Sequence, residues 1–184
     1  EIQIRLVGSE MCIRDSEGPL EKDKGSFIIS GRRTYLDLIM KAAIPDSSPF
    51  AGTSYFFYDL NAKFNYKLSD KDRIFLSGYY GKDVFSFVDN QGGFSVNMPW
   101  GNGIAALRWN HLFNKKLFMN VTGTFSDYMF QFGSSQDQFR FSLTSGVRDI
   151  GSKIDFSYFP NPSHLIKFGA NHIYHTFTPT SVSA

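Results

Sequence analysis

Two short stretches of the sequence hold residues whose types and spacing could do chemistry. The stretch 101–107, GNGIAAL, begins like a dinucleotide-binding loop, but it lacks the third glycine and a strand–helix context. The stretch HIYH places His172 and His175 three residues apart, and on a strand this odd spacing turns them to opposite faces. The sequence therefore predicts a turn entering a strand at the first stretch, and no shared metal site at the second.

Other catalytic and ligand-binding patterns are missing from the sequence. There is no nucleophile elbow, zinc-ligand spacing or phosphate-binding loop, and NVT at 120–122 matches a glycosylation sequon by pattern only. We therefore expect no enzyme, no catalytic residue, no metal and no cofactor. The net charge of +2 is too mild to predict a nucleic-acid partner.

Polar side chains at strand spacing are the remaining candidates for function. In residues 58–68, YDLNAKFNYKL, every second side chain is apolar and those between them are charged or amides. The stretches 72–82, 150–158 and 165–176 repeat this period of two, which is typical of a strand with one apolar and one polar face. The side chains that we expect to face a wet lumen are Asp59, Asn61, Lys63, Asn65, Lys67, Arg73, Lys153, Asp155, Lys167 and Asn171.

The cations on these strands have two interpretations. The first is contact with an anionic solute or with a domain inside a lumen; the second, favoured for any single residue, is pairing with Asp59, Asp72 or Asp155 across strands. Both interpretations concern Arg32, Arg33, Lys63, Lys67, Arg73, Arg108 and Lys153. The phase of strand 26–39 stays open, because Arg32 and Arg33 put a cation on each face.

The elements that carry these residues are predicted to be strands. Aromatic residues make up 17% of the chain, with 20 Phe and 9 Tyr, and such side chains favour strands. Polar turn signals recur about every 46 residues. They separate seven predicted strands: 26–39, 55–68, 72–85, 103–113, 116–132, 138–159 and 164–177. Three longer connections, near 41–54, 86–103 and 132–138, alternate with the short turns, and the weak helical period of TYLDLIMKAA is interpreted as a strand end.

Either lipid or a protein core could cover the apolar faces of these strands. A soluble sandwich alternates as well, but its strands cluster near 5–6 residues, whereas a tilted strand that crosses a bilayer needs about 9–11. Aromatic residues near the strand ends are typical of the girdles of membrane barrels. Placing Lys63 toward lipid would cost about 2–4 kcal/mol, which fixes it on the inner face. The fold prediction is therefore an all-β, antiparallel up-and-down transmembrane barrel fragment of about seven strands, open and curled in isolation.

The first sixteen residues, EIQIRLVGSEMCIRDS, are set apart from this prediction. Residues 6–16 resemble the in-frame translation of a transposase adapter used in short-read sequencing, so we interpret 1–16 as non-native and 17–184 as a partial barrel domain. Cys12 is the only cysteine of the chain, and without this segment 17 basic and 14 acidic residues remain. We expect residues 1–16 to be unpacked or arbitrarily paired.

The remaining sequence resembles a known family. EGPLEKDKGSFIISGRRTYLDL and YFFYDLNAKFNYKLSDKDRIFLSGYYGKD are similar to the TonB-dependent outer-membrane receptors, within them to the type with an N-terminal carboxypeptidase-regulatory-like domain. WGNGIAALRWNHLFNKKLF and GSKIDFSYFPNPSHLIKFGANHIYHTF continue the pattern, so the resemblance covers about 17–179. Its motifs are signatures of turns and strands rather than of catalysis.

This resemblance implies a location and a set of partners. Members of the family are plugged 22-stranded barrels in the outer membrane of Gram-negative bacteria, and they import a scarce solute of the siderophore, cobalamin or oligosaccharide class. The implied partners are outer-membrane lipid, the protein's own plug, the TonB complex and a small solute. The plug and the TonB-contacting residues would precede residue 17, so none is assigned. Two alternatives remain: a barrel without a plug, acting as a pore or adhesin, and a soluble β-sandwich that binds carbohydrate.

Overall fold

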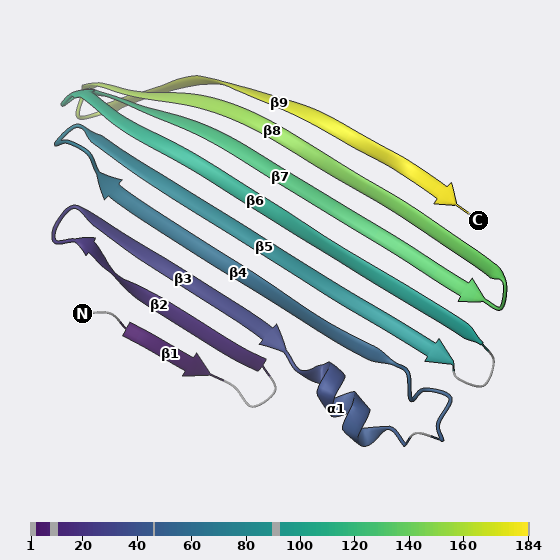
Figure 1. Ribbon diagram of the computed structural model, residues 1–184. Coiled ribbons are helices and arrows are strands. Elements are labelled where there is room, and N and C mark those ends of the chain that lie inside the picture. The colour runs from purple at the N-terminus through teal and green to yellow at the C-terminus, as the bar shows by residue number, and fades with distance from the viewer. Residues whose placement is uncertain (1–2, 8–10, 46, 90–92, 184) are drawn as a thin grey trace.

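The structure is a computed structural model that describes residues 3–7, 11–45, 47–89 and 93–183, and the side chains within 14–45, 47–89 and 93–180. The described residues form nine antiparallel strands, which pair in sequence order within one sheet, and one short helix. The strands lie side by side in a single layer, with β1 and β9 at its two edges (Figure 1). The prediction of an all-β, up-and-down, open antiparallel sheet is confirmed.

The strands lengthen along the chain. Their bounds are β1 Gln3–Val7, β2 Met11–Glu21, β3 Gly25–Thr34, β4 Ser54–Lys67, β5 Asp72–Asp89, β6 Phe94–Asn114, β7 Leu117–Gln136, β8 Phe139–Asn161 and β9 His164–Ser183; the helix α1 is Leu36–Ala43. The seven predicted strands correspond in order to β3 through β9. The two further strands, β1 and β2, come mainly from the segment that the sequence analysis set apart.

The predicted polar turns, which the sequence places near residues 18–26, 68–72, 113–116 and 160–164, are confirmed, and all lie at one end of the sheet (Figure 1). Asparagine side chains hold two of them. Asn114 Oδ1 accepts hydrogen bonds from the backbone N–H groups of Lys116 at 2.8 Å and Leu117 at 3.1 Å. Asn161 Oδ1 accepts one from the N–H of Ser163 at 3.2 Å. Such bonds from a side chain to the following backbone are the reason why asparagine favours turns.

The predicted connections at the other end are wrong in two of three places. β5 continues to Asp89 and β6 begins at Phe94, while only residues 137 and 138 separate β7 from β8. Strand pairing uses the backbone, so Gly- and Ser-rich segments can extend a hairpin whose register is already set. Pro99 lies within β6, where the described pairs with β7 pass from Asn97–Gly133 directly to Trp100–Phe130. The proline therefore sits where no ladder pair to β7 is described.

The interpretation of TYLDLIMKAA as a strand end is also wrong, because residues 36–43 form α1. The segment consists mostly of good helix formers, with Asp37 in the first turn and Lys41 in the last, where they complement the helix dipole. The N–H of Ile44 donates to the carbonyl of Met40 at 2.9 Å, and Pro45 follows. β3 ends at Thr34, so these residues have no strand partner and the local preference for helix prevails.

The described part of residues 1–16 does pair within the sheet. β1 pairs with β2, and β2 pairs with β3 from Met11–Thr34 to Glu21–Gly25. An edge strand offers free backbone donors and acceptors to any extended segment. Pairing here therefore does not distinguish a native strand from an arbitrary one.

A hydrophobic core is nearly absent from the described residues. Met119 is the single buried hydrophobic side chain there, 8% exposed, and Thr34, Asp59 and Ser157 are the buried polar ones. Among the described residues, no second layer packs against either face of the single layer of strands (Figure 1). The large apolar side chains of the sheet consequently remain open on its surface.

Candidate functional site: the two faces of the sheet

The pairing register divides the side chains between two faces. Directly opposed residues of antiparallel strands point to the same side, and successive residues alternate. One face, which we call the apolar face, carries the row Phe27–Phe64–Leu76–Leu107. The other, the polar face, carries the row Asn65–Phe75–Arg108–Thr122–Lys153–Asn171.

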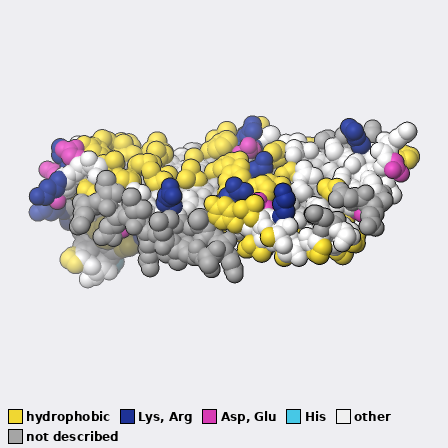
Figure 2. All heavy atoms as spheres, turned by 60° about the horizontal axis from the view of Figure 1, so that its bottom comes forward, with side chains coloured by type: hydrophobic (Ala, Val, Ile, Leu, Met, Phe, Trp, Pro, Cys, Tyr) yellow, Lys and Arg dark blue, Asp and Glu magenta, His cyan; other side chains and the backbone are white. Residues whose placement is uncertain are grey.

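The apolar face is unusually open to its surroundings. Leu107 is 52% exposed, Ile150 55% and Phe168 55%. The rings of Phe156 and Phe168 stack with centroids 5.0 Å apart. Figure 2 shows hydrophobic side chains at the surface of the molecule, interspersed with Lys and Arg side chains. Exposed apolar surface of this extent marks a surface that contacts protein or membrane, or one that promotes aggregation.

The exposed apolar residues form a band of limited height, which we call the apolar band. It spans residues 58–66 of β4, 74–80 of β5, 105–113 of β6, 119–125 of β7, 150–158 of β8 and 166–174 of β9. The apolar-face positions within these ranges include no Asp, Glu, Lys or Arg, although three polar side chains interrupt them: Ser152, the opposed His172, and His111 near the short turns. The band covers about nine residues of most strands, which matches the length that a tilted strand needs to cross hydrocarbon.

Aromatic and polar groups mark the edge of the band beside the short turns. Trp109, His111 and Phe113 follow one another on the apolar face of β6, with ring centroids 5.5 and 4.5 Å apart. Trp109 Nε1 donates to Asp72 Oδ1 at 3.0 Å, and His111 Nδ1 lies 2.6 Å from the same oxygen. The hydroxyl of Ser69 donates to Asp72 Oδ2 at 2.6 Å. These hydrogen bonds, Ser69 first, lower the pKa of Asp72 to about 2.

Charged groups mark the opposite edge of the band. Asp127 and Arg148, paired across β7 and β8, form an ion pair of 3.1 Å on the apolar face, directly beyond Phe125 and Ile150. Tyr80 of β5 shares the row of this ion pair through Gly103, and Lys82 follows it on the same face. Beyond this edge the same face is mainly polar, with the side chains Asn97, Gln131, Arg140, Ser142, Thr144, Thr176 and Thr178. The strands thus extend well past the band.

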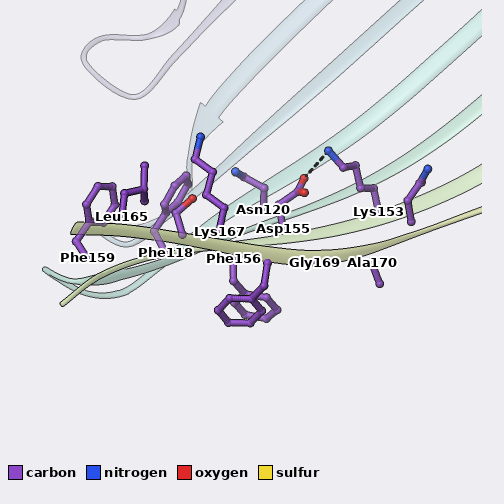
Figure 3. A pocket seen from close by; sticks show the side chains of 13 residues that line it. Phe118, Asn120, Lys153, Asp155, Phe156, Phe159, Leu165, Lys167, Gly169 and Ala170 are labelled. Carbon is purple, nitrogen blue, oxygen red and sulfur yellow. Dashed lines mark ion pairs between the residues drawn. The ribbon is translucent and has the colours of Figure 1, made fainter.

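All ten polar residues predicted for an inner face lie on the polar face. The register places each of them on it, from Asp59 in β4 to Asn171 in β9. Figure 3 shows the division at β7, β8 and β9: Asn120, Lys153, Asp155 and Lys167 project from one side of the strands, together with Phe118, Phe159 and Leu165 near the turns, and Phe156 and Ala170 project from the other.

The open phase of strand 26–39 is assigned by pairing. Arg32 lies opposite Asp59 on the polar face, and its Nε donates to Asp59 Oδ2 at 2.6 Å. Arg33 lies opposite Tyr58 on the apolar face, so of the two cations only Arg32 shares a face with the ten polar candidates. Its guanidinium stays at the edge of the band, 5.3 Å from the ring centroid of Phe56.

The competing interpretation, cross-strand pairing with acids, holds for only some of the cations. Arg32 pairs with Asp59, whereas Lys153 pairs with Asp155 along its own strand at 3.0 Å and Asp72 pairs with His111. Lys67 pairs with Asp70 in the turn. The cations of the polar face without an acidic partner among the described residues are Lys63, Arg73, Arg108 and Lys167.

Beyond the band, the polar face becomes aromatic. Its residues there, which we call the aromatic wall, are Tyr55, Phe57, Phe85, Phe87, Phe94, Trp100, Phe130, Phe132 and Phe141. Tyr55 stacks on Trp100 with centroids 6.4 Å apart, and Phe87 contacts Phe94 at 6.2 Å. The hydroxyl of Tyr55 donates to Asp83 at 2.9 Å; burial, followed by this bond, raises the pKa of Tyr55. Beyond the band, therefore, the polar face becomes aromatic, and the apolar face becomes mainly polar.

The aromatic wall was not predicted, although the sequence contains a signal for it. FSVNMPW, residues 94–100, places Phe94, Val96, Met98 and Trp100 at a strict period of two. The glycines and Pro99 around this stretch led to its interpretation as a loop.

The two histidines of HIYH lie on opposite faces, as predicted, because His172 opposes Ser152 and His175 opposes Asp149. No group of three or more metal-ligating side chains occurs in the part of the chain that the structure describes. No described helix has the length and apolar character needed to cross a bilayer. Comparisons with family models, curated proteins and solved structures found no match to this chain.

Proposed function

We propose that this chain forms part of the wall of a β-barrel in the outer membrane of a Gram-negative bacterium. The observation that carries the proposal is the apolar band: about nine residues high, free of Asp, Glu, Lys and Arg on its face, edged by aromatic and ionic groups, and without a second layer of described residues over it. Hydrocarbon is the medium that fits such a band, and the polar face then lines the lumen. Without lipid, the exposed leucines and phenylalanines would favour aggregation.

Within this class, we assign the chain to a TonB-dependent receptor that imports a scarce solute. The sequence resemblance described above supports this narrower assignment. A plug domain and the TonB complex would be its partners, and the solute would be of the siderophore, cobalamin or oligosaccharide class. The aromatic wall, which lies past the charged edge and away from the short turns, would line the mouth of the lumen on the outer side of the cell.

A spin-label scan of β6 tests the membrane placement. Single cysteines at 104–111 are introduced into the complete protein that contains this chain, labelled and reconstituted into bilayers. Lipid-soluble oxygen is expected to speed the spin relaxation of labels at 105, 107, 109 and 111. An aqueous nickel reagent is expected to do so for labels at 104, 106, 108 and 110. Labels at 95 and 97, beyond the band on the same face as 107, serve as controls and should respond to nickel. Uniform protection from both reagents at 105–111 would instead indicate a soluble core and contradict the proposal.

Energised uptake tests the narrower assignment. A plugged receptor imports its solute only in cells with a working TonB complex, whereas a barrel without a plug admits small solutes passively. Conductance of the reconstituted protein without TonB would therefore favour a pore over a receptor.

A further inference from the structure

Lys63 and Arg108 meet at one hollow on the polar face. The hollow has a volume of about 310 Å³ and lies over β3 to β7 at the level of the apolar band. Lys63 comes from β4 and Arg108 from β6, and both side chains are exposed. Small side chains create the space between them, because Lys63 opposes Ser77 and Ser77 opposes Ala106.

The chemistry of this hollow differs from that of its neighbours. The larger hollow of about 720 Å³ at β8 and β9 includes Lys153 and Lys167, but Asp155 is also part of its lining (Figure 3). A smaller one beside the turn after β4 places Arg73 with Asp70 and Asp72. The hollow of Lys63 and Arg108 has no acidic residue in its lining. Its two positive charges are therefore uncompensated.

Neutral donors complete the lining. Ser77 and Thr122 have hydroxyl groups, and the Asn65 amide, which also bonds to Ser26, lies at the same hollow. A guanidinium, an ammonium and hydroxyl groups around one small space are the donors that bind carboxylate, phosphate or sulfate oxygens. Neither cation forms an ion pair with another described side chain, so an anion would find both free.

We propose that this hollow binds an anionic oxygen group (a carboxylate, phosphate or sulfate) of a solute. The location of the hollow in a transport lumen rests on the proposed function; the anion site itself rests on the lining residues. The site would hold the acidic group of a solute against the lumen wall, with the Arg108 fork orienting it and Lys63 adding charge.

Arginine labelling in the complete protein tests the anion site, with inorganic phosphate as the probe. Phenylglyoxal modification of each arginine is followed by mass spectrometry while phosphate replaces chloride at constant ionic strength. At a phosphate concentration tenfold above its Kd, about a tenth of the sites are free, so modification of Arg108 should slow about tenfold. Arg140, exposed on the opposite face beyond the apolar band, is the matched control and should keep its rate.

A Lys63→Gln variant separates anion binding from unspecific protection. Loss of Lys63 should weaken the protection of Arg108 by phosphate. In chloride buffer, phenylglyoxal should modify Arg108 of the variant at close to the rate found in the parent protein. Equal protection of Arg108 and Arg140, or no protection, would overturn the proposal. An Arg108 that reacts only after denaturation would also overturn it, since the protein's own chain would then fill the hollow.

The spin-label scan of β6 distinguishes this proposal from the proposed function. If the scan shows no lipid-facing side chains while phosphate still protects Arg108, the anion site is supported and its placement in a membrane lumen is contradicted. If the scan shows alternating lipid-facing and water-facing side chains while phosphate does not protect Arg108, the lumen is supported and this anion site is contradicted.

Discussion

Asp72 is the residue around which the edge of the apolar band beside the short turns is organised. Its carboxylate accepts hydrogen bonds from Ser69 and Trp109 and lies 2.6 Å from His111 Nδ1. The folded-state pKa is about 2, below the ordinary value of 3.8. Stabilisation by the ionised carboxylate is therefore complete above about pH 4 and is lost as the pH falls toward 2.

Replacement of Asp72 by Asn tests this arrangement. The variant is expected to unfold at a lower temperature than the parent at pH 6, and to lose the part of the pH dependence between 4 and 2 that the carboxylate causes. Thermal unfolding of the complete protein in detergent, followed by circular dichroism, measures both effects. Asp70→Asn is the control: Asp70 is 93% exposed and its main partner is Lys67 across the turn, so this change should matter less. Identical curves for the two variants would contradict the central role of Asp72.

Charge substitution distinguishes the two faces residue by residue. Leu107→Lys places an ammonium near the middle of the apolar band, where hydrocarbon would cost about 2–4 kcal/mol of folding free energy. Thr124→Lys, exposed on the polar face of the adjacent strand, should change the stability little. Denaturant unfolding in bilayers measures the difference, and equal stabilities would contradict a lipid-facing band.

The sequence predicted the faces of single residues well wherever polar and apolar side chains alternate. All ten inner-face candidates share one face, because a period of two cannot place Asp59 and Lys63 on different sides of one strand. The sequence could not predict the partners of the cations. Whether Arg32 finds Asp59, or Arg108 remains without an acid, depends on the register between strands that are far apart in sequence.

At the scale of elements, glycines show where strands approach too closely for a side chain. A Cβ at Gly169 in β9 would overlap the backbone carbonyl oxygen of Ile154 in β8, whereas at Gly123 in β7 it would meet nothing within 4 Å. Gly169→Ala is therefore expected to destabilise the pairing of β8 with β9 by about 1–3 kcal/mol. Gly123→Ala should be neutral or stabilising by up to about 1 kcal/mol. Faster hydrogen exchange of β9 amides in Gly169→Ala alone would support this prediction; equal exchange in both variants would contradict it.

The sequence predicted the existence and order of the long strands but not their ends beyond the band. Inside the band, alternation identifies each strand; past it, the apolar face becomes polar and serine and glycine become frequent, so 86–103 looks like a loop. The backbone pairs there without help from side-chain pattern. The helix α1 was not predicted because its eight residues, which lie between two strands, are too few to show a clear helical period.

The longest strand is long enough to rise above a bilayer. β8 has 23 residues, a length of about 75 Å when extended, and at a tilt near 45° it would rise about 50 Å. The hydrocarbon needs only about 30 Å of this. The part that remains carries polar groups on one face and the aromatic wall on the other, so it suits water outside the membrane and a ligand or a protein surface inside the barrel.

The two open edges lead to the last prediction, which concerns the isolated chain. β1 and β9 each pair on one side only within the described residues, and a barrel strand in lipid requires partners on both sides. The 184-residue chain alone is therefore expected to form mixed oligomers in detergent, whereas the complete protein should run as one species that migrates faster on a gel before heating than after. Size-exclusion chromatography and unheated electrophoresis measure both properties. A chain that is monomeric and folded in water without detergent would contradict the barrel, because its exposed leucines and phenylalanines would then have found a cover within the same polypeptide.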